Sequence, residues 1–142
     1  MKRLLLPVLT LVLVVSCGGD DDNGPSLAPT TSAPYSQTDL VIGTGAVATA
    51  GSQVTVAYTG WLHDSSRPDA KGTQFDSRPS FPFRLATGAV IRGWDQGVPG
   101  MRVGGQRRLV IPPELAYGNQ SPGAPIPPNA TLVFDITLNN VQ

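Results

Sequence analysis

Apolar and polar side chains alternate along several stretches of the chain, which is the period of a β-strand with one buried face. The clearest stretch is 131–138, where leucine, phenylalanine, isoleucine and leucine alternate with Thr, Val, Asp and Thr. The stretches 54–59, 81–85 and 104–111 show the same period, and 38–42 reads as a short first strand. One face for the core and one for water is typical of antiparallel pairing, so the pattern predicts an antiparallel sheet.

The stretch 90–101 departs from this period. Val90, Trp94, Val98 and Met101 recur at helical spacing, while glycines and a proline among them limit any helix to about two turns. The first N–H groups of such a helix lack intrahelical partners, so the backbone near Ile91 is free to bind a ligand carbonyl. Taken alone, the stretch is explained slightly better as a core helix held by Trp94 than as a site that binds a ligand. A further helical turn is predicted at 113–118, and the fold class is α+β.

The first 34 residues follow neither period. Two basic residues precede the apolar run 4–15, which is too short to span a bilayer, so residues 1–16 are predicted to be a signal peptide. The run ends in a sequence that resembles the lipobox of bacterial lipoproteins, in which Cys17 would be lipidated and become the new N-terminus. Residues 17–34 have almost no large apolar side chains and are expected to form a tether before a domain at 35–142. The alternative is a plain cleaved signal peptide with a stray thiol.

Composition excludes several classes of chemistry. Ten basic and ten acidic residues cancel, so nothing indicates a nucleic-acid partner. Cys17 is the only cysteine, which excludes disulfides and CxxC redox chemistry. His63 is the only histidine and falls in a polar loop predicted at 60–74, without the partners that nucleophilic catalysis needs. We expect no metal and no cofactor. Aromatic and branched side chains beside glycine and proline loops suit an apolar ligand better than proton transfer.

Five motifs together resemble the FKBP-type peptidyl-prolyl cis-trans isomerases. In chain order they are VAYTG (56–60), GTQFDS (72–77), VIRGWDQGV (90–98), AYG (116–118) and IPPNATLVFD (126–135). The resemblance covers essentially the whole domain. It implies an antiparallel five- or six-stranded sheet wrapped around one short helix, rotation of Xaa-Pro bonds, and a site that often binds macrolides.

The resemblance also implies ten pocket residues: Tyr58, Phe75, Asp76, Phe81, Val90, Ile91, Trp94, Tyr117, Ile126 and Phe134. Trp94 would form the floor under the proline ring, with Phe134, Phe75 and Tyr58 as walls. The Ile91 N–H and the Tyr117 hydroxyl would meet substrate carbonyls, and Asp76 would hold the Tyr58 hydroxyl. Each aromatic residue also has a core-packing interpretation, and Trp94 and Phe134 are expected to serve both purposes.

Three departures from the family pattern bear on this assignment. The segment between Asp76 and Phe81 is shorter than in many relatives, so Arg78 is only a substitute for the arginine usual there. Pro125 stands where relatives often have a large apolar residue. The stretch 117–131 is too short to enclose an inserted chaperone domain.

The resulting expectation is an isomerase that assists the folding of exported proteins through an apolar pocket, without covalent or acid–base chemistry. Its partners would be proline-containing segments, a macrolide, and a membrane reached through the lipid on Cys17; we expect a monomer. Gly18 rather than aspartate after the cysteine favours the outer membrane of an envelope with two membranes. The alternatives are a catalytically weak module that binds proline peptides or unfolded chains, and a purely structural lipoprotein.

Overall fold

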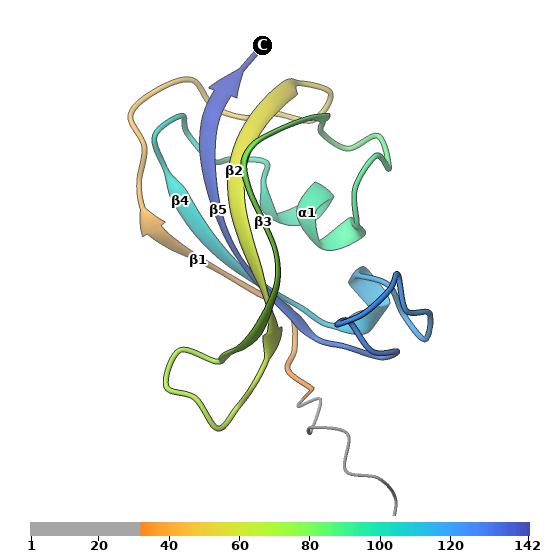
Figure 1. The fold of residues 1–142 in the computed structure, drawn as a ribbon. Helices are drawn as coiled ribbons and strands as arrows, with labels where there is room; N and C mark the ends of the chain where they lie inside the picture. The colour runs from red at the N-terminus through yellow and green to blue at the C-terminus, as the bar shows by residue number, and fades with distance from the viewer. Residues whose placement is uncertain (1–31) are drawn as a thin grey trace, which may run out of the picture.

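A computed structural model describes residues 32–142 of the chain (Figure 1). One antiparallel sheet has the strand order β1-β4-β5-β2-β3. Its strands are β1 (Ser36–Val41), β2 (Gln53–His63), β3 (Lys71–Arg84), β4 (Gln106–Ile111) and β5 (Leu132–Val141). One short helix, α1 (Arg92–Gly97), and one 3-10 turn, η1 (Pro113–Leu115), complete the elements. This confirms the predicted fold class.

The sheet curves around α1, which lies against one of its faces (Figure 1). Side chains from β2, β4 and β5 cover that face because alternate residues of a strand point to the same side. The fully buried ones are Val54, Val56, Leu109, Ile111, Leu132, Ile136 and Leu138. The alternation read from the sequence therefore identifies the buried face of these strands.

Two glycines let α1 approach the sheet closely. A Cβ atom at Gly93 would lie 2.5 Å from Cγ2 of Ile111, and one at Gly97 would lie 2.6 Å from Cδ2 of Leu109. Both contacts are shorter than carbon atoms tolerate, so any larger residue would push the helix away from β4. The spacing of four residues places both glycines on the same side of the helix.

A buried arginine fixes the other end of α1. The Arg107 side chain on β4 is 9% exposed, and its Nε donates to Asp39 of β1 at 2.6 Å. Its Nη1 donates to the carbonyl oxygens of Gly97, at 2.7 Å, and Pro99, at 3.2 Å. The guanidinium thus joins two strands to the C-terminal end of the helix, and its charge is paired, as a buried charge requires.

The opposite face of the sheet holds a charged cluster. Asp135 of β5 accepts hydrogen bonds from Lys71, at 2.6 Å, and from Nε of Arg108, at 2.7 Å. Burial alone would raise the pKa of Asp135, but these two cations outweigh burial and leave the pKa below its usual value. Lys71 also lies 4.1 Å from the ring centre of Trp61. Although Val133 belongs to this face, it is fully buried, with Trp61 and Val110 as its partners on the adjacent strands.

The strands differ in length from those expected from the sequence. The polar loop predicted at 60–74 is shorter in the structure, because β2 continues to His63 and β3 begins at Lys71. Hydrogen bonding between these strands overrides the polar composition of the segment, so only residues 64–70 connect them. The helix is shorter than two turns, and the turn at 113–118 is a single 3-10 turn followed by other loop structure.

The signal peptide, Cys17 and most of the tether lie outside the described residues. Within residues 32–142 no helix is long and apolar enough to cross a membrane.

The close contact between α1 and β4 can be tested with Gly93→Ala. Alanine is the better helix former by about 1 kcal/mol, but overpacking against Ile111 costs about 1–3 kcal/mol. We expect the overpacking to outweigh the gain, with a net loss of up to about 2 kcal/mol in the free energy of unfolding, measured with urea. Gln96→Ala, at an exposed position of the same helix, is the control and should change it by less than about 0.5 kcal/mol. A stabilised Gly93→Ala protein would contradict the packing described here.

Candidate active site

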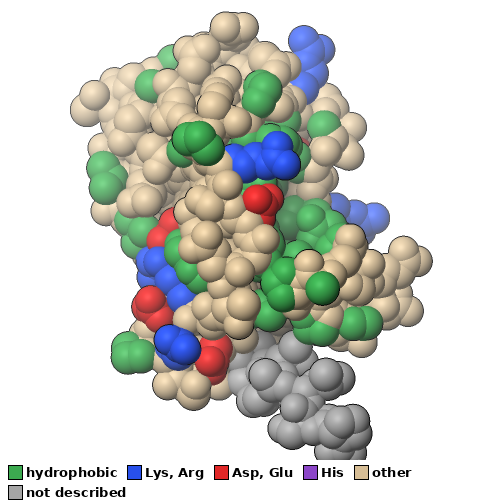
Figure 2. Space-filling view, viewed as in Figure 1, with side chains coloured by type: hydrophobic (Ala, Val, Ile, Leu, Met, Phe, Trp, Pro, Cys, Tyr) green, Lys and Arg blue, Asp and Glu red, His purple; other side chains and the backbone are tan. Residues whose placement is uncertain are grey.

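A hollow of about 180 Å³ opens between β2, β3, the segment before α1, and the loop after η1. Figure 2 shows hydrophobic side chains gathered on this side of the molecule, over the region where Figure 1 places α1 and the 112–131 segment. The residues that line the hollow are mainly aromatic and aliphatic: Tyr58, Phe75, Asp76, Phe81, Ala89, Val90, Ile91, Trp94, Tyr117 and Phe134.

Trp94 forms the base of this hollow and belongs to the core as well. It is 4% exposed and lies near four other aromatic rings. The ring centres of Tyr58 and Phe134 are 4.9 and 5.3 Å from that of Trp94, at interplanar angles of 80° and 86°. Phe81 and Phe83 complete the set at 6.0 and 5.6 Å. Edge-to-face pairs of this kind stabilise both partners beyond simple burial, so the indole is held from several sides.

The wall opposite depends on a glycine. Phe75 and Phe134 meet edge to face, with ring centres 5.5 Å apart and an interplanar angle of 87°. A Cβ atom on Gly60 would lie 2.6 Å from Cζ of Phe75 and 2.8 Å from Cε1 of Phe134. Gly60 of β2 therefore provides the space in which both rings sit. Its role could not be predicted from the sequence, because it depends on two residues distant in the chain.

One corner of the hollow is polar. The Tyr58 hydroxyl donates to Oδ2 of Asp76 at 2.5 Å, and the N–H of Ser77 donates to Oδ1 of the same carboxylate at 2.8 Å. Burial raises the pKa of Tyr58 to about 12, and the hydrogen bond and charge of Asp76 add to the effect. Burial followed by the charge of Asp76 also raises the pKa of Tyr117. Both tyrosines are therefore neutral hydroxyl groups at neutral pH.

Arg78 lies at the rim beside this corner. Its Nε is 4.0 Å from Oδ2 of Asp76, and its guanidinium carbon is 5.8 Å from the ring centre of Phe81. Its side chain is 57% exposed, and screening by water makes so distant an ion pair weak. Arg78 thus occupies the region expected of a substitute arginine and holds Asp76 only loosely.

The structure brings together nine of the ten residues that the sequence assigns to the pocket. Ile126 is not among the lining residues; it is 8% exposed and packs in the core. Ala89 lines the hollow and was not predicted, since a small residue in a turn carries no sequence signal. The backbone N–H of Ile91, which precedes α1, has no hydrogen-bond partner among the described residues, whereas its carbonyl accepts from Trp94 at 3.0 Å.

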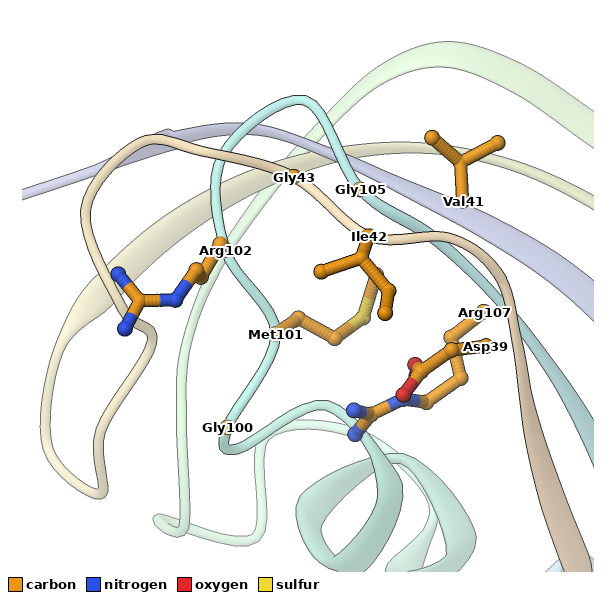
Figure 3. Close-up of a pocket in the computed structure, with 9 residues that line it drawn as sticks. All are labelled: Asp39, Val41, Ile42, Gly43, Gly100, Met101, Arg102, Gly105 and Arg107. Atoms are coloured by element: carbon orange, nitrogen blue, oxygen red, sulfur yellow. Dashed lines mark hydrogen bonds and ion pairs between the residues drawn. The ribbon is translucent and has the colours of Figure 1, made fainter.

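A second hollow, of about 70 Å³, lies where β1 ends and β4 begins (Figure 3). It has no aromatic lining residue, and three glycines contribute to its wall. In Figure 3 the Arg107 and Asp39 side chains face each other, and this pair already has its hydrogen bonds. Besides this pair, the hollow offers a ligand the aliphatic side chains of Val41, Ile42 and Met101 and the guanidinium of Arg102. Within residues 32–142 no group of three or more His, Cys, Asp or Glu side chains could hold a metal ion.

The polar corner can be tested by titration. Because the pKa of Tyr58 is raised in the folded protein, its hydroxyl stabilises the fold fully below the unfolded pKa of about 10. That contribution disappears as the pH rises through about 12. Tyr58→Phe should therefore be destabilised by about 1 kcal/mol at pH 7, and the difference from wild type should shrink above about pH 10. Asp76→Asn should lower the pKa of Tyr58, measured by tyrosinate absorbance. An unchanged titration in Asp76→Asn would contradict the hydrogen bond.

Comparison with known proteins identifies the family. The family of FKBP-type peptidyl-prolyl cis-trans isomerases matches residues 45–139. An FK506-binding protein of Neisseria meningitidis serogroup A is 44% identical over 103 residues, which are 72% of this chain and 92% of that protein. FK506-binding protein 1B of Neurospora crassa is 45% identical over 105 residues, 72% of this chain and 93% of that protein. The 46 kDa FK506-binding nuclear protein of Spodoptera frugiperda is 46% identical over 107 residues, 73% of this chain but only 24% of that longer protein.

Solved structures agree with the sequence comparison. The crystal structure of AtFKBP13 superposes with a TM-score of 0.64 at 36% identity and covers 76% of this chain and 93% of its own. FkpA from Escherichia coli gives a TM-score of 0.63 at 39% identity, over 76% of this chain and 48% of FkpA. Matched motifs, shared fold and an aromatic hollow in the expected place lead to one conclusion: the chain belongs to the FKBP-type peptidyl-prolyl cis-trans isomerases and has the isomerase activity of that family.

Proposed function

We propose that the aromatic hollow is the isomerase site and that it works by shape and polarity alone. The observation that carries the proposal is the position of Trp94, which forms part of the core and also the base of an open hollow. A prolyl ring is a compact apolar group that fits a base and walls made of aromatic rings. The lining contains one carboxylate, Asp76, and Tyr58 already donates to it, so no free acid–base pair faces the substrate.

Rotation about an Xaa-Pro bond is slow because the twisted amide loses resonance, which creates a barrier of about 18–20 kcal/mol. The twisted amide is less dipolar than the planar one, so removal from water disfavours the planar ground state more than the transition state. Each 1.4 kcal/mol or so of that difference gives about a tenfold gain in rate. No bond is made or broken and no proton moves, which agrees with a site that holds its polar groups in fixed pairs.

Each wall then has a role. Trp94, Phe134 and Phe75 grip the proline ring, and the Ile91 N–H holds the carbonyl that precedes it. Tyr117 is 40% exposed, and its hydroxyl meets a second substrate carbonyl at the rim. Asp76 keeps the Tyr58 hydroxyl turned away from the proline.

The same hollow is proposed to bind a macrolide. Several relatives are named for binding FK506, and each matches 72% of this chain. A flat aromatic base with a few hydrogen-bonding groups at the rim suits a rigid apolar ligand. Arg78 and Pro125 lie where the family pattern changes and would affect the fit at the rim.

The cellular role is proposed to be folding of exported proteins at a membrane surface. Residues 1–16 read as a signal peptide and Cys17 as a lipidation site, and several acyl chains on one residue give stable anchoring. Chains that fold after export wait tens of seconds or more for prolyl isomerisation, so an anchored isomerase would act on a slow step.

The role of Trp94 can be tested with Trp94→Leu and Trp94→Ala. Loss of the aromatic base should reduce kcat/KM for a Leu-Pro peptide by about tenfold or more. Phe83→Leu is the matched control: Phe83 packs on Trp94 within the core but does not line the hollow. The folded Phe83→Leu protein should therefore keep most of its kcat/KM for the same peptide. Wild-type turnover in a folded Trp94→Leu protein would refute the assignment.

Binding and turnover measured on the same peptide separate an isomerase from a weak binding module. A module would bind the peptide without accelerating isomerisation, whereas the proposed site does both.

The anchor can be tested with Cys17→Ser in a bacterial host. The wild-type chain should incorporate labelled fatty acid and sediment with membranes. The variant should do neither, because serine has no thiol to carry the lipid. A wild-type chain that stays unlabelled and soluble would leave only a cleaved signal peptide.

A further inference from the structure

The segment that carries one rim of the hollow has little packing of its own. Leu85, directly after β3, is fully buried and exchanges hydrogen bonds with Gly51 and Ser52. The next buried residues are in α1. Between them, residues 86–89 are all exposed, yet Ala89 lines the hollow together with Val90 and Ile91. Something other than burial must hold this segment in place.

The carboxylate of Asp95 makes the connection. Oδ1 of Asp95 accepts the backbone N–H of Ala86 at 3.0 Å, and Oδ2 accepts that of Gly88 at 3.1 Å. Both oxygens of one side chain thus bind two alternate amides of the same turn, and hydrogen bonds to a charged acceptor are the stronger kind. Asp95 follows Trp94 directly on α1, so one helical turn carries the base of the hollow and the anchor of its rim.

The backbone of this turn is unusual at the two residues that Asp95 holds. Ala86 has a φ of 59° and Gly88 a φ of 75°. The left-handed region is disfavoured for alanine, so this conformation persists only where other contacts impose it. Besides the Asp95 bonds, the turn has a hydrogen bond from the Thr87 hydroxyl to the Arg84 carbonyl, at 2.9 Å.

We propose that Asp95 is a positioning residue of the isomerase: its carboxylate clamps the 86–88 turn and thereby sets the distance between Trp94 and the rim formed by Val90 and Ile91. This inference rests on the proposed function of the hollow. Asp95 itself is not among the lining residues, so it acts through the turn that it holds.

The test compares Asp95→Asn with Asp95→Glu in the whole protein. The asparagine amide keeps one acceptor but turns a donor toward the second backbone N–H, so half of the clamp is lost. We expect kcat/KM for a Leu-Pro peptide to fall about tenfold, mainly through KM, because rim contacts act on bound substrate as well as on the transition state. Glutamate retains both acceptor oxygens and should restore part of the loss. Amide hydrogen exchange at Ala86 and Gly88 should accelerate in Asp95→Asn.

Two controls separate positioning from stability. Asp135→Asn loses its ion pairs on the opposite face of the sheet, and Gln96→Ala changes an exposed neighbour on α1; neither residue lines the hollow. Both should retain kcat/KM within about twofold of wild type when folded. The proposal is overturned if Asp95→Asn matches these controls in kcat/KM, or if exchange at Ala86 and Gly88 is unchanged. Failure of the site assignment itself would appear differently, as full activity in Trp94→Leu.

Discussion

The close approach of α1 to the sheet is the constraint on which the rest of the structure depends. Gly93 and Gly97 remove the side chains that would separate the helix from β4. Trp94, between them in the sequence, is then carried into the ring cluster of the sheet rather than out into water. The base of the hollow is therefore as rigid as the core, because it is a part of the core. Arg107 strengthens this arrangement from the far end of the helix.

The polar groups at one corner of the hollow hold one another in fixed hydrogen bonds. Asp76 is bound by Tyr58 and by a backbone amide, and Tyr58 keeps its proton far above neutral pH. Fixed pairs of this kind shape one corner of the hollow without offering a base to the substrate. The hollow thus combines a buried aromatic base with a rim that can hold carbonyl groups, an arrangement that suits the proposed rotation about an imide bond.

Much of this could be predicted from the sequence because it is local. Period-two alternation identified the buried face of β5, and glycines around Trp94 limited the helix. Features that depend on distant residues could not be read in this way. Gly60 matters because Phe75 and Phe134 meet above it, and Asp95 because the 86–88 turn folds back to it. The polar ends of β2 and β3 are strand because they pair with each other, which their composition does not show.

The central claim is that an apolar hollow speeds bond rotation without any proton transfer. The most direct measurement is kcat/KM for a Leu-Pro peptide across the pH range in which the fold is stable, repeated in D₂O. The account predicts a flat pH profile and the same rate in both solvents, since no group titrates in the rate-limiting step. A bell-shaped profile, or a clear slowing in D₂O, would show that an acid or base takes part and would contradict the account.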